Sequence, residues 1–139
     1  MITLDLPIRA VPQPRHRATL GGRMYLPSAA PVRAFKAAVQ TAARAKIRRP
    51  FAGPVAVAIH VLFARPPSHL TARGLVRRGA PGWPGQNLGD IDNVAKAALD
   101  ALIGIAFADD AQVVRLSGSK AWGMADRTVI EVEPMEVQT

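Results

Sequence analysis

The hydrophobic residues of this 139-residue chain change their spacing several times, and this alternation limits the possible folds more than any other feature. Apolar residues alternate with other residues over 2–9 and 55–63, which predicts two strands that each bury one face. Apolar residues recur at helical spacing over 31–47 and 92–104, which predicts two amphipathic helices. The chain therefore begins with a β-α-β-α pattern.

Two further strands are predicted at 112–117 and 127–133, paired as a hairpin. The full order β-α-β-α-β-β predicts an α/β (α+β) fold in which two helices pack on a small mixed sheet. The length suits a single domain over 1–139, because domains of about 100–150 residues are the most common. Residues 65–89 are rich in Pro, Gly and Arg and lack periodicity. They predict a long, structureless and mobile basic loop.

Basic and acidic residues are distributed unevenly along the chain. Residues 1–89 hold 14 Lys and Arg and one acid, Asp5, hence +13, whereas residues 90–139 hold four bases and nine acids, hence −5. A strongly basic half favours a polyanionic partner, and the alternative is a basic surface that only keeps a small protein soluble. The candidates for contact with a DNA backbone are Arg15, His16, Arg17, Arg23, Arg77, Arg78 and Lys120.

Several classes of protein are excluded by composition. The chain has no cysteine, so it has neither disulfides nor thiolate metal sites. Its longest apolar stretch, residues 54–64, is too short to span a bilayer, and the N-terminus does not read as a secretory signal. We therefore expect a soluble, cytoplasmic protein with no membrane partner. Aromatic residues form only 5% of the chain, which is few for a protein that stacks successive bases. Trp83 is a candidate either for insertion into DNA or for packing, and Trp122 is expected to pack.

Acidic residues cluster in GDIDNVAKAALDALIGIAFADDAQV, residues 89–113. Asp90 and Asp92 are two positions apart, so in an extended segment they point to the same side. A helix followed by a reversing strand would return Asp109 and Asp110 towards them. Crowded carboxylates repel one another, and a divalent cation relieves that repulsion. Oxygen-only ligands favour Mg²⁺, with Mn²⁺ as an alternative, over zinc.

Each of these residues also has a purely structural interpretation. Asp92 is well placed to be the N-cap of the helix that follows it. Asp109 and Asp110 suit a turn. Lys96 lies one helical turn after Asp92, so it forms either an ordinary surface ion pair or a positive charge beside a scissile phosphate. The short motif D-x-D-N leaves both interpretations open.

The complete spacing is more specific. D-x-D-N-x-x-K-x-x-x-D-A-L, then six residues, then D-D-x-Q-V closely resembles the RusA family of Holliday-junction resolvases. The likeness extends more loosely to the basic segment PRHRATLGGRMYLP, to the helix after it and to Lys120. Many relatives carry a His and a Lys or Pro shortly before D-x-D-N, where this chain has PGWPGQNLGD.

The resemblance implies a homodimeric, Mg²⁺-dependent endonuclease that cuts four-way DNA junctions by a symmetric pair of nicks. By position in the motif, Asp90, Asp92 and Asp110 match the essential metal-binding carboxylates, and Lys96 matches the essential lysine. Asp109 is the less favoured member of its pair, and Asp100 is expected to be structural. Paired cuts also suit a two-fold dimer, which carries two identical sites. The alternatives are a non-catalytic nucleic-acid-binding module and a nuclease acting on other branched DNA or on RNA.

Overall fold

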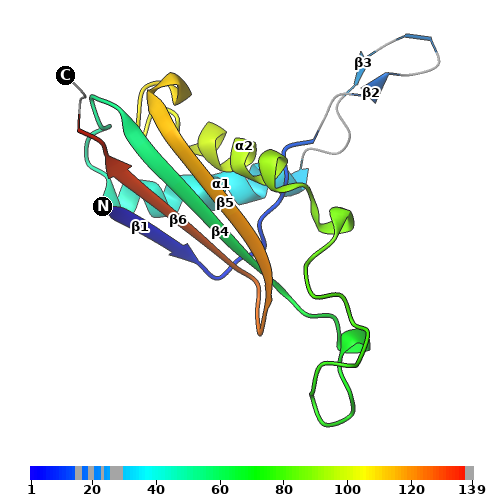
Figure 1. Ribbon diagram of the computed structural model, residues 1–139. Helices are drawn as coiled ribbons and strands as arrows, with labels where there is room; N and C mark the ends of the chain where they lie inside the picture. Colours follow the sequence, from blue (N-terminus) through cyan, green and yellow to red (C-terminus); the bar gives the residue numbers. More distant parts are fainter. Residues whose placement is uncertain (15–16, 19–20, 23, 26–29, 137–139) are drawn as a thin grey trace.

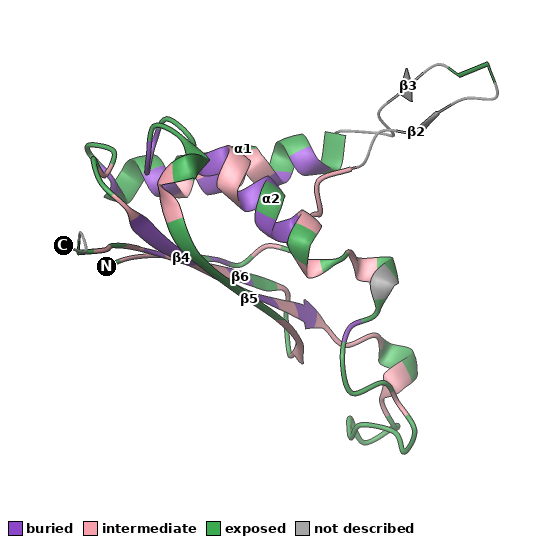
Figure 2. Cartoon of the chain, turned by 45° about the horizontal axis from the view of Figure 1, so that its top comes forward, coloured by how far each residue is buried: buried purple, intermediate pink, exposed green. Residues whose placement is uncertain are grey.

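Four strands form one sheet, and two helices cover one of its faces (Figure 1, Figure 2). The computed structural model describes residues 1–14, 17–18, 21–22, 24–25 and 30–136. The sheet and the two helices consist of β1 (Ile2–Leu6), α1 (Ala30–Lys46), β4 (Val55–Ala64), α2 (Ile91–Leu102), β5 (Val113–Gly123) and β6 (Arg127–Pro134). The predicted α+β class, the order of these elements and the mixed sheet are confirmed. The sequence pattern did not predict the short antiparallel pair β2 (Arg17–Ala18) and β3 (Met24–Tyr25).

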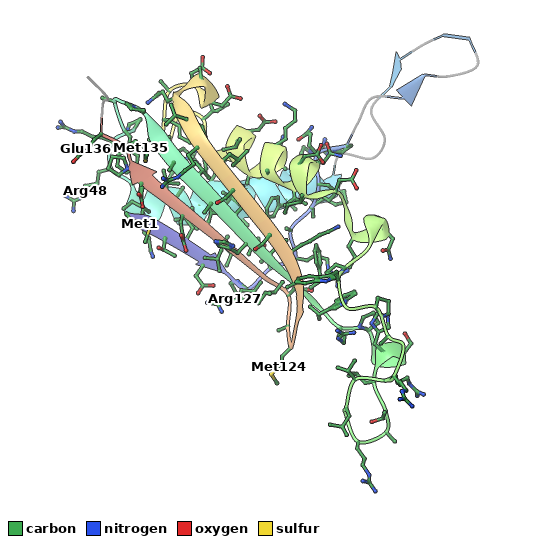
Figure 3. All side chains as sticks on the ribbon, in the orientation of Figure 1. Met1, Arg48, Met124, Arg127, Met135 and Glu136 are labelled. Atoms are coloured by element: carbon green, nitrogen blue, oxygen red, sulfur yellow. The ribbon has the colours of Figure 1, made fainter. Side chains whose placement is uncertain are left out.

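The predicted hairpin of the last two strands is wrong. The spatial order is β1-β6-β4-β5, so β5 runs parallel to β4 on one side, whereas β6 runs antiparallel to β4 on the other. Burial explains this order. Thr128, Ile130 and Val132 of β6 are fully buried and suit an inner strand, whereas most of β5 is exposed and suits an edge. The turn that crosses the end of β4 carries Met124 at its tip (Figure 3).

The core lies between the sheet and the helices (Figure 2). Strand β4 contributes alternate side chains from Val55 to Phe63, and α1 contributes a stripe that includes Phe35 and Val39. Helix α2 buries mainly small residues, among them Ala97, Ala98 and Ala101. Burying a Val, Leu, Ile or Phe side chain stabilises a fold by about 1.5–3 kcal/mol, so this layer holds α2 firmly against the sheet. The position of α2 matters because the acidic motif begins at its first turn.

Residues 65–89 extend beyond the end of β4 as a long connection that holds no α-helix and no strand of the sheet, and their mobility stays a prediction (Figure 1). The segment contains two 3₁₀ turns, η1 (Pro67–His69) and η2 (Gln86–Leu88), and an antiparallel bridge between Leu70 and Val76. Backbone hydrogen bonds such as Arg77 N to His69 O, 2.7 Å, close its outer half. Local turns and bridges have no long periodicity, so a search for periodic patterns does not find them.

Within the described part of the chain, no helix combines the length and apolar character needed to cross a membrane.

Candidate active site

Helix α2 begins earlier than the sequence pattern predicts. Asp90 occupies the N-cap position with extended backbone angles, and its carbonyl accepts hydrogen bonds from the N–H groups of Asn93 and Val94, each at 3.1 Å. Asp92 therefore lies inside the first turn, and its prediction as the N-cap is wrong. Its Oδ1 accepts from the Asn93 N–H at 2.9 Å. The Asp90 side chain is exposed and forms no capping bond, so no described helix N–H occupies its carboxylate.

The backbone before Asp90 is tightly constrained. Gly89 has φ +100°, and a Cβ at this position would lie 2.6 Å from Cγ of Pro12. Only glycine fits both the angle and the close approach. Gln13 follows Pro12 in the chain, and its N–H donates to the carbonyl of Asn93 at 2.9 Å. The N-terminal segment thus packs directly against the D-x-D-N motif.

Lys120 lies within β5 rather than after it, and it reaches the same region. Its Nζ donates to the carbonyl oxygens of Gly89, 3.2 Å, and Gly85, 3.5 Å. Nearby, Ile91 packs over Gly118, where an added Cβ would lie 3.1 Å from Cγ1 of Ile91. The predicted DNA contact of Lys120 stays a prediction. In the structure its ammonium group links the backbone before Asp90 to strand β5 through these two hydrogen bonds.

The second acidic pair is positioned by Gln112. Asp109 is the N-cap of η3 (Asp110–Gln112), and its Oδ1 accepts from Ala111 N at 2.9 Å. The Gln112 amide donates to the carbonyls of Phe51, 2.7 Å, and Gly53, 2.9 Å, while its oxygen accepts from Ala108 N at 2.9 Å. Asp109 is thereby used in a capping box, whereas the exposed Asp110 takes no part in that box.

The two carboxylates of this pair interact. The Ala111 N–H, followed by a hydrogen bond with Asp110, lowers the pKa of Asp109. The same hydrogen bond raises the pKa of Asp110, and partial desolvation and the charges of Asp109 and Asp100 act in the same direction. Lys96 opposes this increase. Asp110 therefore lies within electrostatic range of Lys96 and Asp100.

Helix α2 links the two acidic pairs. Asp92, Lys96 and Asp100 are spaced by four residues, so they follow one face of the helix from its first turn to its third. Asp100 also pairs with Lys36 of α1, with Oδ2 and Nζ 3.7 Å apart. Lys96 thus lies between Asp92 and Asp100 on this face of the helix, and its charge also acts on Asp110.

The predicted metal ligands do not form one compact group. Among the described residues, no three His, Asp or Glu side chains lie close enough together to hold a metal ion. Mg²⁺, however, is usually bound through one or two carboxylates, with waters and substrate phosphate oxygens as the other ligands. Asp90 and Asp92, one on each side of Ile91 at the start of α2, match that donor chemistry.

The predicted DNA contacts are only partly described. Arg15, His16 and Arg23 lie outside the described residues, and Arg17 is described only as part of β2. Arg77 and Arg78 are exposed on the outer half of the 65–89 segment, where Arg77 Nε donates to Leu70 O at 2.8 Å.

The sequence analysis did not identify the supporting roles of Gln112 and Pro12, or the effect of Asp100 on Asp110. Gln112 had a usable signal, because Asp109-x-x-Gln112 is a capping-box pattern. The contact of Pro12 with Gly89 joins positions 77 residues apart, and no local pattern reports it. Asp100 was expected to be structural, and its ion pair with Lys36 agrees, but its charge also acts on Asp110.

Comparison with protein families identifies one match. The model of the RusA endodeoxyribonucleases matches residues 7–133, which include both acidic pairs, Lys96, both helices and strands β4 and β5. No curated protein matches the sequence closely enough to add a relative by name. The match extends over nearly the full chain and contains the motif D-x-D-N and its partner D-D-x-Q. The chain belongs to the RusA family of endodeoxyribonucleases.

Proposed function

We propose that this protein is a Mg²⁺-dependent endonuclease that cuts four-way (Holliday) DNA junctions by paired, symmetric nicks during DNA recombination and repair. Membership of an endodeoxyribonuclease family supports the reaction class and DNA as the substrate. The observation that carries the site is the start of α2. Asp90 and Asp92 lie there on a backbone held by Gly89, Pro12 and Lys120, and the Asp90 carboxylate has no capping role.

Asp90 and Asp92 would hold the metal, and Asp110 would approach it from the turn before β5. A bound Mg²⁺ supplies Lewis-acid chemistry, because it stabilises the negative charge that develops at phosphorus. Lys96, one helical turn after Asp92 and with a charge that acts on Asp110, would orient the scissile phosphate and offset its charge. Mn²⁺ prefers the same oxygen ligands and is expected to substitute.

The basic residues would bring the DNA to this acidic site. Residues 65–89 carry four arginines and no acid, and their last residue, Gly89, directly precedes Asp90. Their phosphate contacts would release counterions, so binding should weaken steeply with salt. A homodimer would place two such sites about a two-fold axis, which matches two cuts in opposed strands of a junction.

The test is cleavage of a labelled four-way junction, a linear duplex and a structured RNA, each with Mg²⁺, with Mn²⁺ and with EDTA. We expect cleavage of the junction alone, by two symmetric nicks, and only with metal. The variant Asp92→Asn should bind the junction and fail to cut it. The control Asp5→Asn changes an aspartate of β1 that pairs with Arg127, and it should cut normally. Equal cutting of all three substrates would contradict junction selectivity, and cutting in EDTA or by Asp92→Asn would contradict the metal site.

A further inference from the structure

A pocket of about 260 Å³ lies between the 65–89 segment and the end of the sheet. Its walls include the two tryptophans of the chain, Trp83 and Trp122, together with His69, Arg9 and Leu88. This volume is below the 300–1,000 Å³ typical of sites for drug-sized ligands, so the pocket suits one small planar group.

One wall of the pocket is held rigidly. The indole Nε1 of Trp122 donates to the carbonyl of Pro81 at 3.0 Å. The ring of His69 meets Trp122 edge to face, with centroids 5.2 Å apart. The Arg65 guanidinium lies 5.3 Å from the Trp122 ring centroid, and its Nη1 donates to the same Pro81 carbonyl at 2.9 Å. Trp122 is therefore a fixed surface whose polar atom already has a partner.

The other tryptophan is left open. Trp83 is 73% exposed, although the next residue, Pro84, is buried and anchors the backbone beside it. Leu75 and Met124 are also highly exposed, but neither lines this pocket. An exposed indole on the wall of a pocket offers a flat apolar face, and that is the shape on which a nucleobase stacks.

The pocket adjoins the proposed cutting site. Its lining includes Gly85, Asn87 and Leu88, which belong to the stretch that Lys120 holds by hydrogen bonds to Gly85 and Gly89. Asp90 follows directly. A DNA strand whose phosphate lies at Asp90 and Asp92 would therefore present a neighbouring nucleotide to the mouth of the pocket.

The charge around the pocket suits a nucleotide. Residues 65–89 contain no acid, and Arg73, Arg77 and Arg78 are exposed on their outer half. Arg9 and Ala64, which line the pocket, both bind the carboxylate of Asp126, through Arg9 Nε at 3.2 Å and through the Ala64 N–H at 2.9 Å. A flat apolar wall with Arg9 in the lining and Arg65 over the Trp122 ring matches a base attached to a phosphate backbone.

We propose that this pocket receives one unstacked nucleobase of the strand being cut, stacked on Trp83 and bounded by Trp122. The proposal rests on the proposed function and adds to it a site that reads the DNA beside the cut. Bases near a branch point unstack at lower cost than bases within a continuous duplex, so the pocket would favour branched DNA. Asn87, in the lining, would supply the amide that contacts a base edge.

The test is a scan with abasic nucleotides, with binding measured in EDTA so that the result does not depend on cleavage. Each nucleotide near the crossover of a labelled four-way junction is replaced in turn by an abasic analogue. The wild-type protein should lose about five- to 150-fold in affinity at one position, because a base stacked on an aromatic ring contributes about 1–3 kcal/mol. Trp83→Ala should bind the intact junction more weakly and lose this positional effect, whereas Trp83→Phe should retain it.

The matched control is Leu75→Ala, which removes another exposed apolar side chain of the same segment from outside the pocket. It should behave as wild type. An abasic profile that is flat for the wild type, or unchanged by Trp83→Ala, would overturn the proposal. So would a Trp83→Ala variant that changes the oligomeric state and leaves the profile intact, because the pocket would then belong to a protein interface. Cleavage by Asp92→Asn, in contrast, would contradict the metal site and leave a positive abasic profile standing.

Discussion

The two aspartate pairs of the motif are built in opposite ways. At the start of α2, Asp90 holds the N-cap position without a capping bond, and its position depends on the packing of Gly89 against Pro12. In the turn before β5, Asp109 caps η3, and the Gln112 side chain holds that turn by donating to the carbonyls of Phe51 and Gly53. The first pair is placed by backbone packing and the second by a polar network. An aspartate used as a cap supports the turn, whereas an aspartate without that task is available for chemistry.

The largest expected effect comes from the carboxylates at the start of α2. Asp90→Asn and Asp92→Asn should each lower junction cleavage by about a hundredfold or more, since loss of a ligand should cost at least as much as the 10–100-fold typical of outer-shell changes. Thermal unfolding should stay close to wild type, because both side chains are exposed. If either variant cut the junction at a near wild-type rate, the carboxylate it lacks would not be needed for cleavage.

Replacing Gly89 tests the packing that places the first pair. Gly89→Ala should destabilise the fold by about 2–3 kcal/mol, because positive φ and the contact with Pro12 both penalise a Cβ. Gly104→Ala is the matched control: its φ is +86°, but an added Cβ meets nothing within 4 Å. The control should lose only about 1 kcal/mol in urea unfolding. Equal losses would show that the contact with Pro12 contributes nothing.

Replacing Gln112 tests the polar network of the second pair. Gln112→Ala removes the bonds to Phe51 and Gly53 and should destabilise the protein by about 1–2 kcal/mol. Gln112→Glu retains the acceptor for Ala108 N and loses the donor, so it separates the two halves of the network. Urea unfolding of both variants measures the loss. If both match wild type, the turn is held by something other than this side chain.

The smallest expected effect is on thermal stability: replacing Asp109 and replacing Asp110 should shift the melting temperature in opposite directions. The lowered pKa of Asp109 stabilises the fold above the pKa of the unfolded state, and this stabilisation is lost as pH falls. The raised pKa of Asp110 has the opposite effect. Above the pKa of the unfolded state, ionisation of Asp110 costs more in the folded than in the unfolded protein, so it destabilises the fold. At pH 7, Asp109→Ala should lower the melting temperature and Asp110→Asn should raise it slightly. Shifts of the same sign would contradict the assigned roles.

Much of the fold could be predicted because its signals are local. The alternation from Val55 to Phe63 and the helical spacing after Pro31 depend on neighbouring residues, and both elements have nearly the predicted bounds. The start of α2 was misplaced because Asp90 and Asp92 are equally good N-cap residues by type. In the structure Gly89 packs against Pro12 directly before the helix, and Asp90 is the N-cap. The order of β5 and β6 was also missed, because the short connection between them predicts a hairpin.

The sequence by itself determined the elements, the uneven charge and the spacing of the acidic motif, because each of these depends on residues close together in the chain. Only the tertiary structure decided that β6 lies between β1 and β4, that Lys120 holds the backbone before Asp90, and that Trp83 and Trp122 line one pocket. The physical reason is the same in each case. These contacts join residues tens of positions apart, and which of them form depends on how the buried faces of all the elements fit together.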